Sequence, residues 1–427
     1  MNEISQKMSV NIPVIRHLDR VAASLLALCP VLQHYQGPLF NMALTVMVLL
    51  VPYLMCRVVL EWKNLNWALL KPIWALVAYM IFRVVDHGTS VTELGQACVL
   101  ILYFAVAALG CIDIRWMCRT AMVVSGIAAA LLVVQYICFY VLGFHLQLVP
   151  VKLLLPSAEQ WILGVRTGLA SITGKIRESG LYRPSAFFLE PSHAYIYIFP
   201  HLFLSLFGKR HGRFPLIPAM VLSLGLVLTT SGMGIAVVCA AWGLYVALFD
   251  EKTQRFSLRN LIRWRTVILL TCAAVALVVA VVFVPQVNLM VMRIFVHEPG
   301  KQTAIAGRVA SAMKDLRKMD LKQWIIGVED TTHGITHNMP GAIAAVYRHG
   351  LIGLILSTEF YAKSIWKLKM PFWLVALVIF VTSFFSAHTH STVGMMYFVL
   401  ILMLGYHTRL RKENFVATGC GITDGAE

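Results

Sequence analysis

The residues with the most chemical potential lie between Arg183 and His193, in the segment RPSAFFLEPSH, just before a long apolar run. Charged groups at a membrane boundary cost free energy, so their presence there requires an explanation. Proline suits the first turn of a helix, so Pro191 places Glu190 at the N-cap of the helix that follows. A carboxylate there can accept a proton or a hydrogen bond, and a guanidinium can bind an anion through paired hydrogen bonds.

Two interpretations of this segment compete. In the structural one, Glu190 only neutralises the positive end of the helix dipole, and Arg183 anchors the chain to lipid headgroups. In the functional one, Glu190 is a general base or accepts a hydrogen bond from a substrate hydroxyl, and Arg183 binds an anionic group. His193, one turn into the helix, is interpreted as a packed residue rather than a catalyst. The preceding cations suit a phosphate-bearing ligand: Arg166, Lys175 and Arg177.

A second group of cations begins at Arg308. Residues 308–318 have apolar positions at helical spacing, which predicts an amphipathic helix at a membrane surface. Most of the basic side chains in this helix are expected to face solvent or headgroups. Arg308 differs, because a cation at a helix N-terminus opposes the helix dipole unless an anion lies nearby. Arg308 is therefore a candidate anion ligand.

A short helix is expected to follow, because Asn338 and Pro340 mark a helix start and Gly350 marks an end. His337 lies just ahead of this helix, in a loop rich in arginine, and histidine is the side chain that titrates near neutral pH. Arg348 lies at the far end, where its planar guanidinium suits a phosphate. His337 and Arg348 are therefore candidates for a base and a phosphate ligand.

These residues need a scaffold, and the composition predicts one that spans a membrane. Of 427 residues, 59% are hydrophobic and only 13% are charged, which excludes an ordinary soluble domain. The net charge of +16 comes largely from clusters between apolar runs and from two long loops, so membrane orientation and an anionic ligand explain it better than nucleic acid. About twelve runs approach or reach the length that spans a bilayer: residues 21–36, 38–60, 66–86, 91–110, 117–144, 191–208, 215–230, 233–249, 266–285, 350–366, 371–388 and 392–407.

The basic clusters between these runs predict the orientation. They fall on alternate connections, which the positive-inside rule places in the cytoplasm together with both termini. Residues 408–427 are expected to form a cytoplasmic tail. Two opposite connections are long, residues 145–190 and 286–349, and are expected outside the cytoplasm. Residues 1–427 are thus predicted to form a single all-α, polytopic membrane domain with two long extracytoplasmic loops that carry short helices.

The sequence predicts no metal and no cofactor. The nine cysteines fall in spans, on the cytoplasmic side or in the tail, so neither a disulfide framework nor a cysteine metal site is expected. His388 and His390 would point to different sides of a helix and have no carboxylate beside them. No glycine-rich nucleotide-binding motif is present in a strand and helix setting.

The two long loops resemble those of the O-antigen polymerase and ligase superfamily, bacterial glycosyltransferases of the GT-C type. The resemblance covers mainly residues 177–234 and 307–355. In the first stretch it rests on a pattern typical of the polymerase branch: Arg183, Phe188 and Glu190-Pro191-Ser192. In the second it rests on a pattern that polymerases and ligases share: Gly307-Arg308, Trp324, Gly327, His337-Asn338 and the run from His349 to Gly353. Ligases often have an arginine after the serine at the outer end of the seventh span, whereas Gly232 follows Ser231 here, which favours a polymerase.

The resemblance implies an enzyme that transfers a growing glycan from undecaprenyl pyrophosphate to a sugar hydroxyl of a new lipid-linked repeat unit. No cofactor is implied, because the donor is already activated. The cations that would stabilise the leaving pyrophosphate are Arg183 and Arg308, with Arg348 next. His337 is the first candidate for the base. Glu190 is the second, because a helix N-terminus keeps a glutamate ionised and less basic.

The expected location is the bacterial cytoplasmic (inner) membrane. Expected partners are the lipid-linked glycan, membrane lipids, a chain-length regulator and a flippase. Two other functions stay open: a ligase that moves a finished glycan to another carrier, and a transporter or flippase, which would place its site near the bilayer midplane on broken helices. The midplane candidates lie towards helix ends while the polar chemistry concentrates in the outer loops, which favours the enzyme: Arg83, Glu93 and Glu359.

Overall fold

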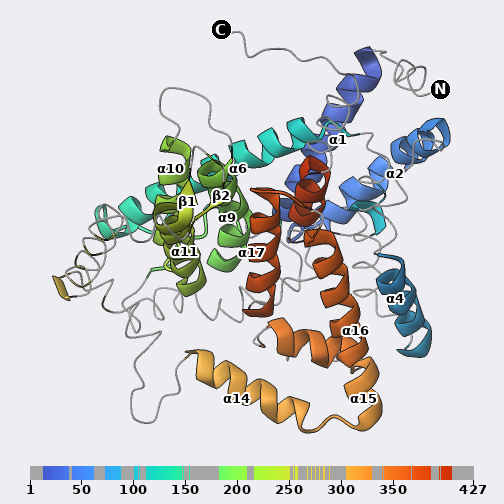
Figure 1. Ribbon diagram of the computed structural model, residues 1–427. Coiled ribbons are helices and arrows are strands. Elements are labelled where there is room, and N and C mark those ends of the chain that lie inside the picture. Colours follow the sequence, from blue (N-terminus) through green and yellow to red (C-terminus); the bar gives the residue numbers. More distant parts are fainter. Residues whose placement is uncertain are drawn as a thin grey trace.

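In the computed structural model the chain folds into helices that pack against one another (Figure 1). The structure describes residues 13–37, 41–61, 73–87, 101–103, 112–146, 182–208, 216–250, 255–257, 304–328, 341–366, 368–385 and 396–405, together with isolated positions between these ranges.

The described part of the chain is mostly helical, in line with the expected all-α class. Its helices are α1 (Pro13–Leu32), α2 (Met42–Glu61), α4 (Trp74–His87), α6 (Ile114–Tyr140), α9 (Pro191–Phe207), α10 (Ile217–Leu228), α11 (Gly232–Leu248), α14 (Ala304–Leu316), α15 (Leu321–Ile326), α16 (Gly341–Ile365) and α17 (Phe372–Phe385). A further apolar helix covers Met396–Gly405. Two short strands, β1 (Phe249–Asp250) and β2 (Arg255–Phe256), form an antiparallel pair after α11.

Two of these helices, α6 and α16, are long and apolar enough to cross a membrane. Shorter apolar helices accompany them, at Met42–Arg57, Trp74–Arg83, Ile217–Leu228, Gly232–Leu248, Phe372–Ser383 and Met396–Gly405. This set of helices favours a membrane protein. The number of about twelve spans stays a prediction.

Helix α9 coincides closely with the expected run 191–208, whereas α1 starts earlier and ends earlier than the expected run 21–36. The difference at the end of α1 has a clear cause in the sequence. The polar residues Gln33, His34 and Gln36 leave the helix and form a connection to α2. This connection contacts the segment that leads to Glu190, because the Tyr35 hydroxyl donates to the carbonyl oxygen of Phe187.

Local signals in the sequence explain several helix starts. The Asp113 side chain caps α6 by accepting a hydrogen bond from the Trp116 amide, at 3.1 Å. Pro191 occupies the first turn of α9, as the sequence predicts. Helix α15 begins with a capping box in which Asp320 and Gln323 each accept the other's backbone amide through their side chains.

Helix α16 joins two elements that the sequence predicts separately, a short helix ending at Gly350 and an apolar run from residue 350 onward. Gly350 has φ 63° and ψ −176°, which is not helical, so α16 bends there. The predicted break at Gly350 is therefore confirmed. The two halves of α16 continue one after the other across this bend.

Helix α9 lies at the centre of the described core and is buried along most of its length. Helices α6, α10, α11 and α17 all pack against it (Figure 1). Burial on all faces is expected for a helix that is apolar on every side. Buried hydroxyls also tie it in place: Tyr197 donates to the carbonyl oxygen of Ala27 in α1 at 2.7 Å, and Tyr397 donates to the carbonyl oxygen of Tyr197 at 2.6 Å.

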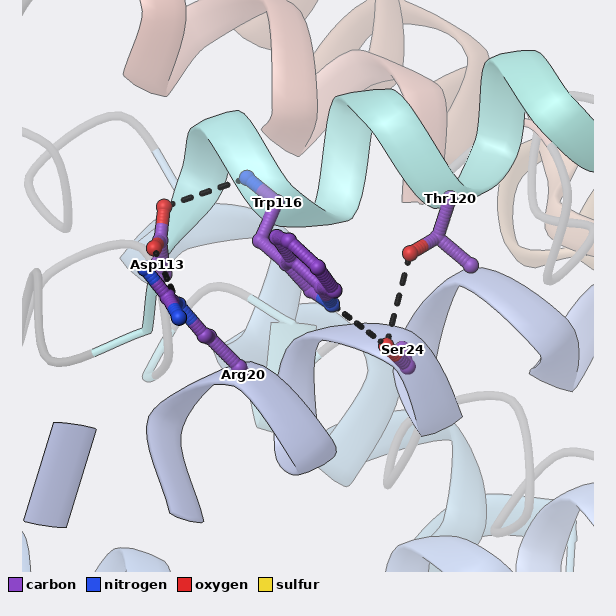
Figure 2. A network of polar contacts seen from close by, with 5 residues as sticks. All are labelled: Arg20, Ser24, Asp113, Trp116 and Thr120. Carbon is purple, nitrogen blue, oxygen red and sulfur yellow. Dashed lines mark hydrogen bonds and ion pairs between the residues drawn. The ribbon is translucent and has the colours of Figure 1, made fainter. Parts of the chain in front are cut away.

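A polar network holds α1 against the first turns of α6 (Figure 2). Besides capping α6, Asp113 forms an ion pair with Arg20 at 3.5 Å. The Trp116 indole donates to Ser24 at 2.9 Å, and the Ser24 hydroxyl lies 3.3 Å from that of Thr120. These contacts fix α1 relative to α6, the helix whose other end anchors the candidate site.

Candidate functional site

The structure describes three of the five predicted site residues with their side chains: Arg183, Glu190 and Arg348. His337 lies outside the described residues, so its role as a base stays a prediction. For Arg308 only the position in the backbone is described.

Arg308 does not occupy the first turn of its helix. Helix α14 begins at Ala304, because the residues ahead of Arg308 include two alanines, which favour a helix. The prediction that Arg308 lies at the helix N-terminus is therefore wrong, and its conflict with the helix dipole is weaker because the dipole acts mainly over the first turn. Its role as an anion ligand stays a prediction.

The segment that carries Arg183 is anchored by α6. The Tyr182 amide donates to the Tyr140 hydroxyl at 2.9 Å, and the Ala186 amide donates to the Gln135 side-chain oxygen at 2.8 Å. Gln135, in turn, donates through its amide nitrogen to the carbonyl oxygen of Leu146 at 3.0 Å. Ala186 has a φ of 51°, a conformation that costs free energy for a residue with a side chain and that the bond to Gln135 helps to hold.

Aromatic packing fixes the same segment from a second side. The Tyr182 ring stacks on Phe139 with centroids 4.4 Å apart and meets the His145 ring edge-on at 5.2 Å. Burial raises the pKa of the Tyr182 hydroxyl to about 12 and lowers the pKa of His145, so both groups are neutral at neutral pH. Phe188 is also buried, with its ring 5.4 Å from Tyr197.

Arg183 is exposed although its neighbours Tyr182 and Pro184 are buried. The Tyr182 carbonyl also accepts a hydrogen bond of 3.4 Å from Thr230, in the turn between α10 and α11. The backbone on one side of Arg183 is thus fixed by α6 and by this turn. A guanidinium on a fixed backbone, with its side chain accessible, is suited to bind an anion that arrives from outside.

Glu190 occupies the N-cap position of α9 with an extended backbone, as predicted, but its side chain does not cap the helix. Instead, the Ser192 hydroxyl donates to Glu190 Oε2 at 2.6 Å. This bond orients the half-buried carboxylate. A carboxylate has about four acceptor positions, so Glu190 can also accept a hydroxyl from a ligand.

The connection between α1 and α2 forms one wall of this region, which sequence analysis did not anticipate. The rings of His34 and His193 are stacked, with centroids 4.6 Å apart and planes inclined by 21°. The Tyr35 hydroxyl donates to the carbonyl oxygen of Phe187 at 3.0 Å. The polar run that includes His34 and Tyr35, at the end of an apolar run, is the signal in the sequence that could have revealed this wall.

Arg348 lies at a corner where α15 meets the bend of α16, and α4 packs against α16 beside it. The amide of Val328 donates to the carbonyl oxygen of Tyr347 at 2.8 Å, which joins the end of α15 to α16. Gly327 and Gly350 allow the two backbones to touch. A Cβ atom added to Gly350 would lie 2.2 Å from the carbonyl oxygen of Ile325.

Two side chains of α4 close this corner. Arg83 is 1% exposed, and its Nη1 lies 2.7 Å from His349 Nδ1 while its Nη2 donates to the Val328 carbonyl oxygen at 3.3 Å. The Tyr79 hydroxyl lies 2.6 Å from the His349 carbonyl oxygen and 2.9 Å from that of Ile326, so it bridges the two helices. The sequence marks Arg83 only as a charge towards a helix end.

The structure therefore brings Arg183 and Glu190 together on one anchored segment and sets Arg348 on a separate rigid corner. Helix α17 packs against both α9, which follows the first segment, and α16, which carries the corner. Among the described residues, no group of three or more His, Cys, Asp and Glu side chains could hold a metal. His388 and His390 lie outside them. What these two places can do chemically is to bind an anion and to accept a hydrogen bond from a hydroxyl.

No protein-family model matches the chain, and no curated protein matches it. A function for this chain therefore has to follow from its own residues and their contacts.

Proposed function

We propose that this protein is a polysaccharide polymerase, a glycosyltransferase that joins lipid-linked oligosaccharide repeat units of an O-antigen, capsule or exopolysaccharide. The growing glycan would leave undecaprenyl pyrophosphate and attach to a sugar hydroxyl of a new lipid-linked repeat. The observation that supports this most is the segment of residues 182–190. It holds an exposed guanidinium at Arg183 and an oriented carboxylate at Glu190 on one backbone anchored to α6.

The reaction requires two kinds of group, and the chain offers both. The oxygen of the acceptor hydroxyl forms a bond to the anomeric carbon of the donor, and the bond from that carbon to the pyrophosphate oxygen breaks. Negative charge then develops on the leaving pyrophosphate, where Arg183, Arg308 and Arg348 would stabilise it. The proton of the acceptor hydroxyl passes to a base, for which His337 is the first choice.

Glu190 has a different role in this proposal. It lies at the start of α9, and the hydrogen bond from Ser192 orients its side chain as a hydrogen-bond acceptor. Glu190 would therefore accept a hydrogen bond from the acceptor sugar and orient it. No cofactor takes part, because the pyrophosphate already activates the donor.

The proposed setting is the bacterial cytoplasmic membrane, crossed about twelve times, with both termini in the cytoplasm. Residues 145–190 and 286–349 would then lie on the outer face, where lipid-linked repeats arrive after a flippase has moved them. A chain-length regulator would be a partner. The apolar helices of the described chain support this setting, since several of them expose large apolar side chains such as Leu49, Val59 and Val85.

Surface polysaccharide from a strain that lacks this chain provides the test. Loss of a polymerase leaves single repeat units on the final carrier, whereas loss of a ligase leaves polymer that stays on undecaprenyl pyrophosphate. Loss of a flippase leaves repeats on the cytoplasmic side of the membrane, and no glycan reaches the surface. We expect single repeats, with the full ladder restored by the wild-type chain. Either of the other two patterns would contradict the polymerase and select the corresponding alternative.

A further inference from the structure

We propose that Arg83 and Tyr79 of α4 are positioning residues of the transfer reaction, which fix the corner between α15 and α16 and thereby place the guanidinium of Arg348. This inference rests on the proposed function, in which Arg348 contacts the pyrophosphate. It assigns a role to α4, a helix far from both long loops in the sequence.

Arg83 is buried at some cost in free energy. Its side chain is 1% exposed, and a buried guanidinium is expensive unless its donors are bonded. The structure gives these donors two acceptors from the corner, His349 Nδ1 and the Val328 carbonyl oxygen. His349 belongs to α16, and Val328 follows the C-terminal end of α15, so Arg83 links both sides of the corner to α4.

The hydrogen bond from Arg83 also determines the protonation of His349. A guanidinium has donors and no acceptor, so His349 Nδ1 must accept the hydrogen bond from Arg83. The imidazole is therefore neutral, and its proton lies on Nε2. Arg83 thus fixes both the tautomer and the ring orientation of the residue that follows Arg348.

The backbone carbonyl groups of Arg348 and of both its neighbours are held in place. The Tyr347 carbonyl accepts the Val328 amide, and the His349 carbonyl lies 2.6 Å from the Tyr79 hydroxyl. The Arg348 carbonyl itself is packed against Gly327, where a Cβ atom would lie 2.2 Å from its oxygen. The side chain of Arg348 is half-buried with a buried Nε, so its stem is held as well.

Such rigidity has a use when the bound group is a leaving pyrophosphate. Stabilisation of developing charge is strongest when the donor groups are placed before the reaction and do not have to reorganise. A displacement of about 1 Å that arises away from the chemistry can lower a rate about 100-fold. Removing Arg83 should therefore affect catalysis through the position of Arg348, without any contact between Arg83 and the substrate.

The test compares purified full-length variants in lipid nanodiscs, with lipid-linked repeat units extracted from a polymerase-null strain as the substrate. We expect Arg83→Met to lower kcat about 100-fold with a smaller change in KM, and Arg83→Lys to restore part of the rate. Tyr79→Phe removes only the bridging hydroxyl and should lower kcat in the same direction. If Arg83→Met does not fold, the Tyr79→Phe variant still tests the proposal.

A matched control and a double variant separate positioning from general stability. Arg57 of α2 is also largely buried and forms an ion pair with Asp19, so Arg57→Met should lower thermal stability and leave kcat unchanged. In the Arg348→Met background, Arg83→Met should lower kcat by less than about threefold, because the residue through which it acts is already absent. Losses that multiply in the double variant, or an equal loss in Arg57→Met, would overturn the positioning role. A wild-type protein that forms no polymer from these substrates would instead overturn the proposed function, and the positioning role with it.

Discussion

Gln135 of α6 and Ala186, 51 residues further along the chain, are joined by a hydrogen bond of 2.8 Å in which the side-chain amide accepts the backbone N–H. The same side chain donates to the carbonyl oxygen of Leu146 at 3.0 Å. One side chain thus ties together the two ends of a long connection. The anchored segment that presents Arg183 depends on this residue.

Removing the amide of Gln135 should loosen the segment of residues 182–190. Gln135→Met leaves the Ala186 amide and the Leu146 carbonyl without this partner, which costs about 1–3 kcal/mol for each group that stays buried. Gln135→Glu keeps an acceptor for Ala186 but loses the donor to Leu146 and places an acidic group in a buried position, so it should also loosen the segment at neutral pH. The effects of both substitutions can be measured by thermal unfolding and by hydrogen exchange of residues 182–190. Equal exchange in all three proteins would show that the segment is held elsewhere.

Substitution of Arg183 should abolish polymer formation without loss of protein. Arg183 is exposed and contributes little to the core, so Arg183→Ala should keep the wild-type protein level and leave single lipid-linked repeats. Arg183→Lys should retain part of the activity, since an ammonium keeps the charge and loses the paired geometry. Arg317→Ala is the matched control, because Arg317 is also exposed on a basic surface and has no proposed role. The readout is the glycan ladder, and a normal ladder in Arg183→Ala would exclude this residue from the site.

The roles of His337 and Glu190 can be separated by the dependence of the rate on pH. If His337 is the base, His337→Ala should remove the acid limb of the kcat profile, which falls as the imidazole is protonated. Glu190→Gln keeps an acceptor oxygen, so it should raise KM for the acceptor and leave the shape of the profile unchanged. Ser192→Ala should act in the same direction and more weakly, because the carboxylate loses only its orienting donor. A profile unchanged by His337→Ala would remove it as the base.

The anchored segment should become less stable in acid. Burial lowers the pKa of His145 from its usual value of 6.5, so the folded state binds fewer protons than the unfolded state below that value. Stability is therefore complete above about pH 6.5 and falls as the pH falls towards the folded pKa. His145→Phe keeps an aromatic ring beside Tyr182 and removes the titration. Thermal unfolding between pH 7.5 and about 5 should show a smaller decrease in this variant than in the wild type.

The corner at Gly350 should not tolerate a side chain. A Cβ atom there would lie 2.2 Å from the Ile325 carbonyl oxygen, and the backbone has a positive φ, so Gly350→Ala should separate α15 from α16. We expect a loss of thermal stability of about 1–3 kcal/mol together with loss of activity. Gly126→Ala in α6 is the control, because a Cβ atom there meets no atom within 4 Å. In an open helical position, alanine is favoured over glycine. A similar effect of both substitutions would contradict the close approach at the corner.

Helix boundaries can be predicted from the sequence where a local signal marks them. Pro191 marks the start of α9 and Gly350 the bend of α16, because both residues restrict or permit particular backbone angles wherever they occur. The start of α14 was predicted less well, since alanine and isoleucine ahead of Arg308 carry no boundary signal. The first apolar run, predicted from hydrophobicity alone, continues through Gln33 and His34, whereas α1 ends at Leu32.

Contacts between distant segments could not be predicted in this way. Arg83 inside an apolar run is a signal that a partner exists, because a charge there needs one. The sequence contains 14 histidines, however, and nothing local points to His349, which is 266 residues away. The stacking of His34 on His193 could not be predicted for the same reason. Such pairs depend on how the helices pack, which a single sequence does not encode in any short window.

The length of α6 sets the height at which the anchored segment is held. Its 27 residues span about 40 Å at a rise of about 1.5 Å per residue, whereas the hydrocarbon core of a bilayer is about 30 Å thick. A tilt of about 20°, typical of membrane helices, removes only a small part of the excess. If α6 spans the membrane, Tyr140 and Gln135 near its C-terminal end extend towards or beyond the hydrocarbon boundary. The length of α6 would then place Arg183 at the level of the lipid headgroups, where the pyrophosphate of a lipid-linked glycan lies.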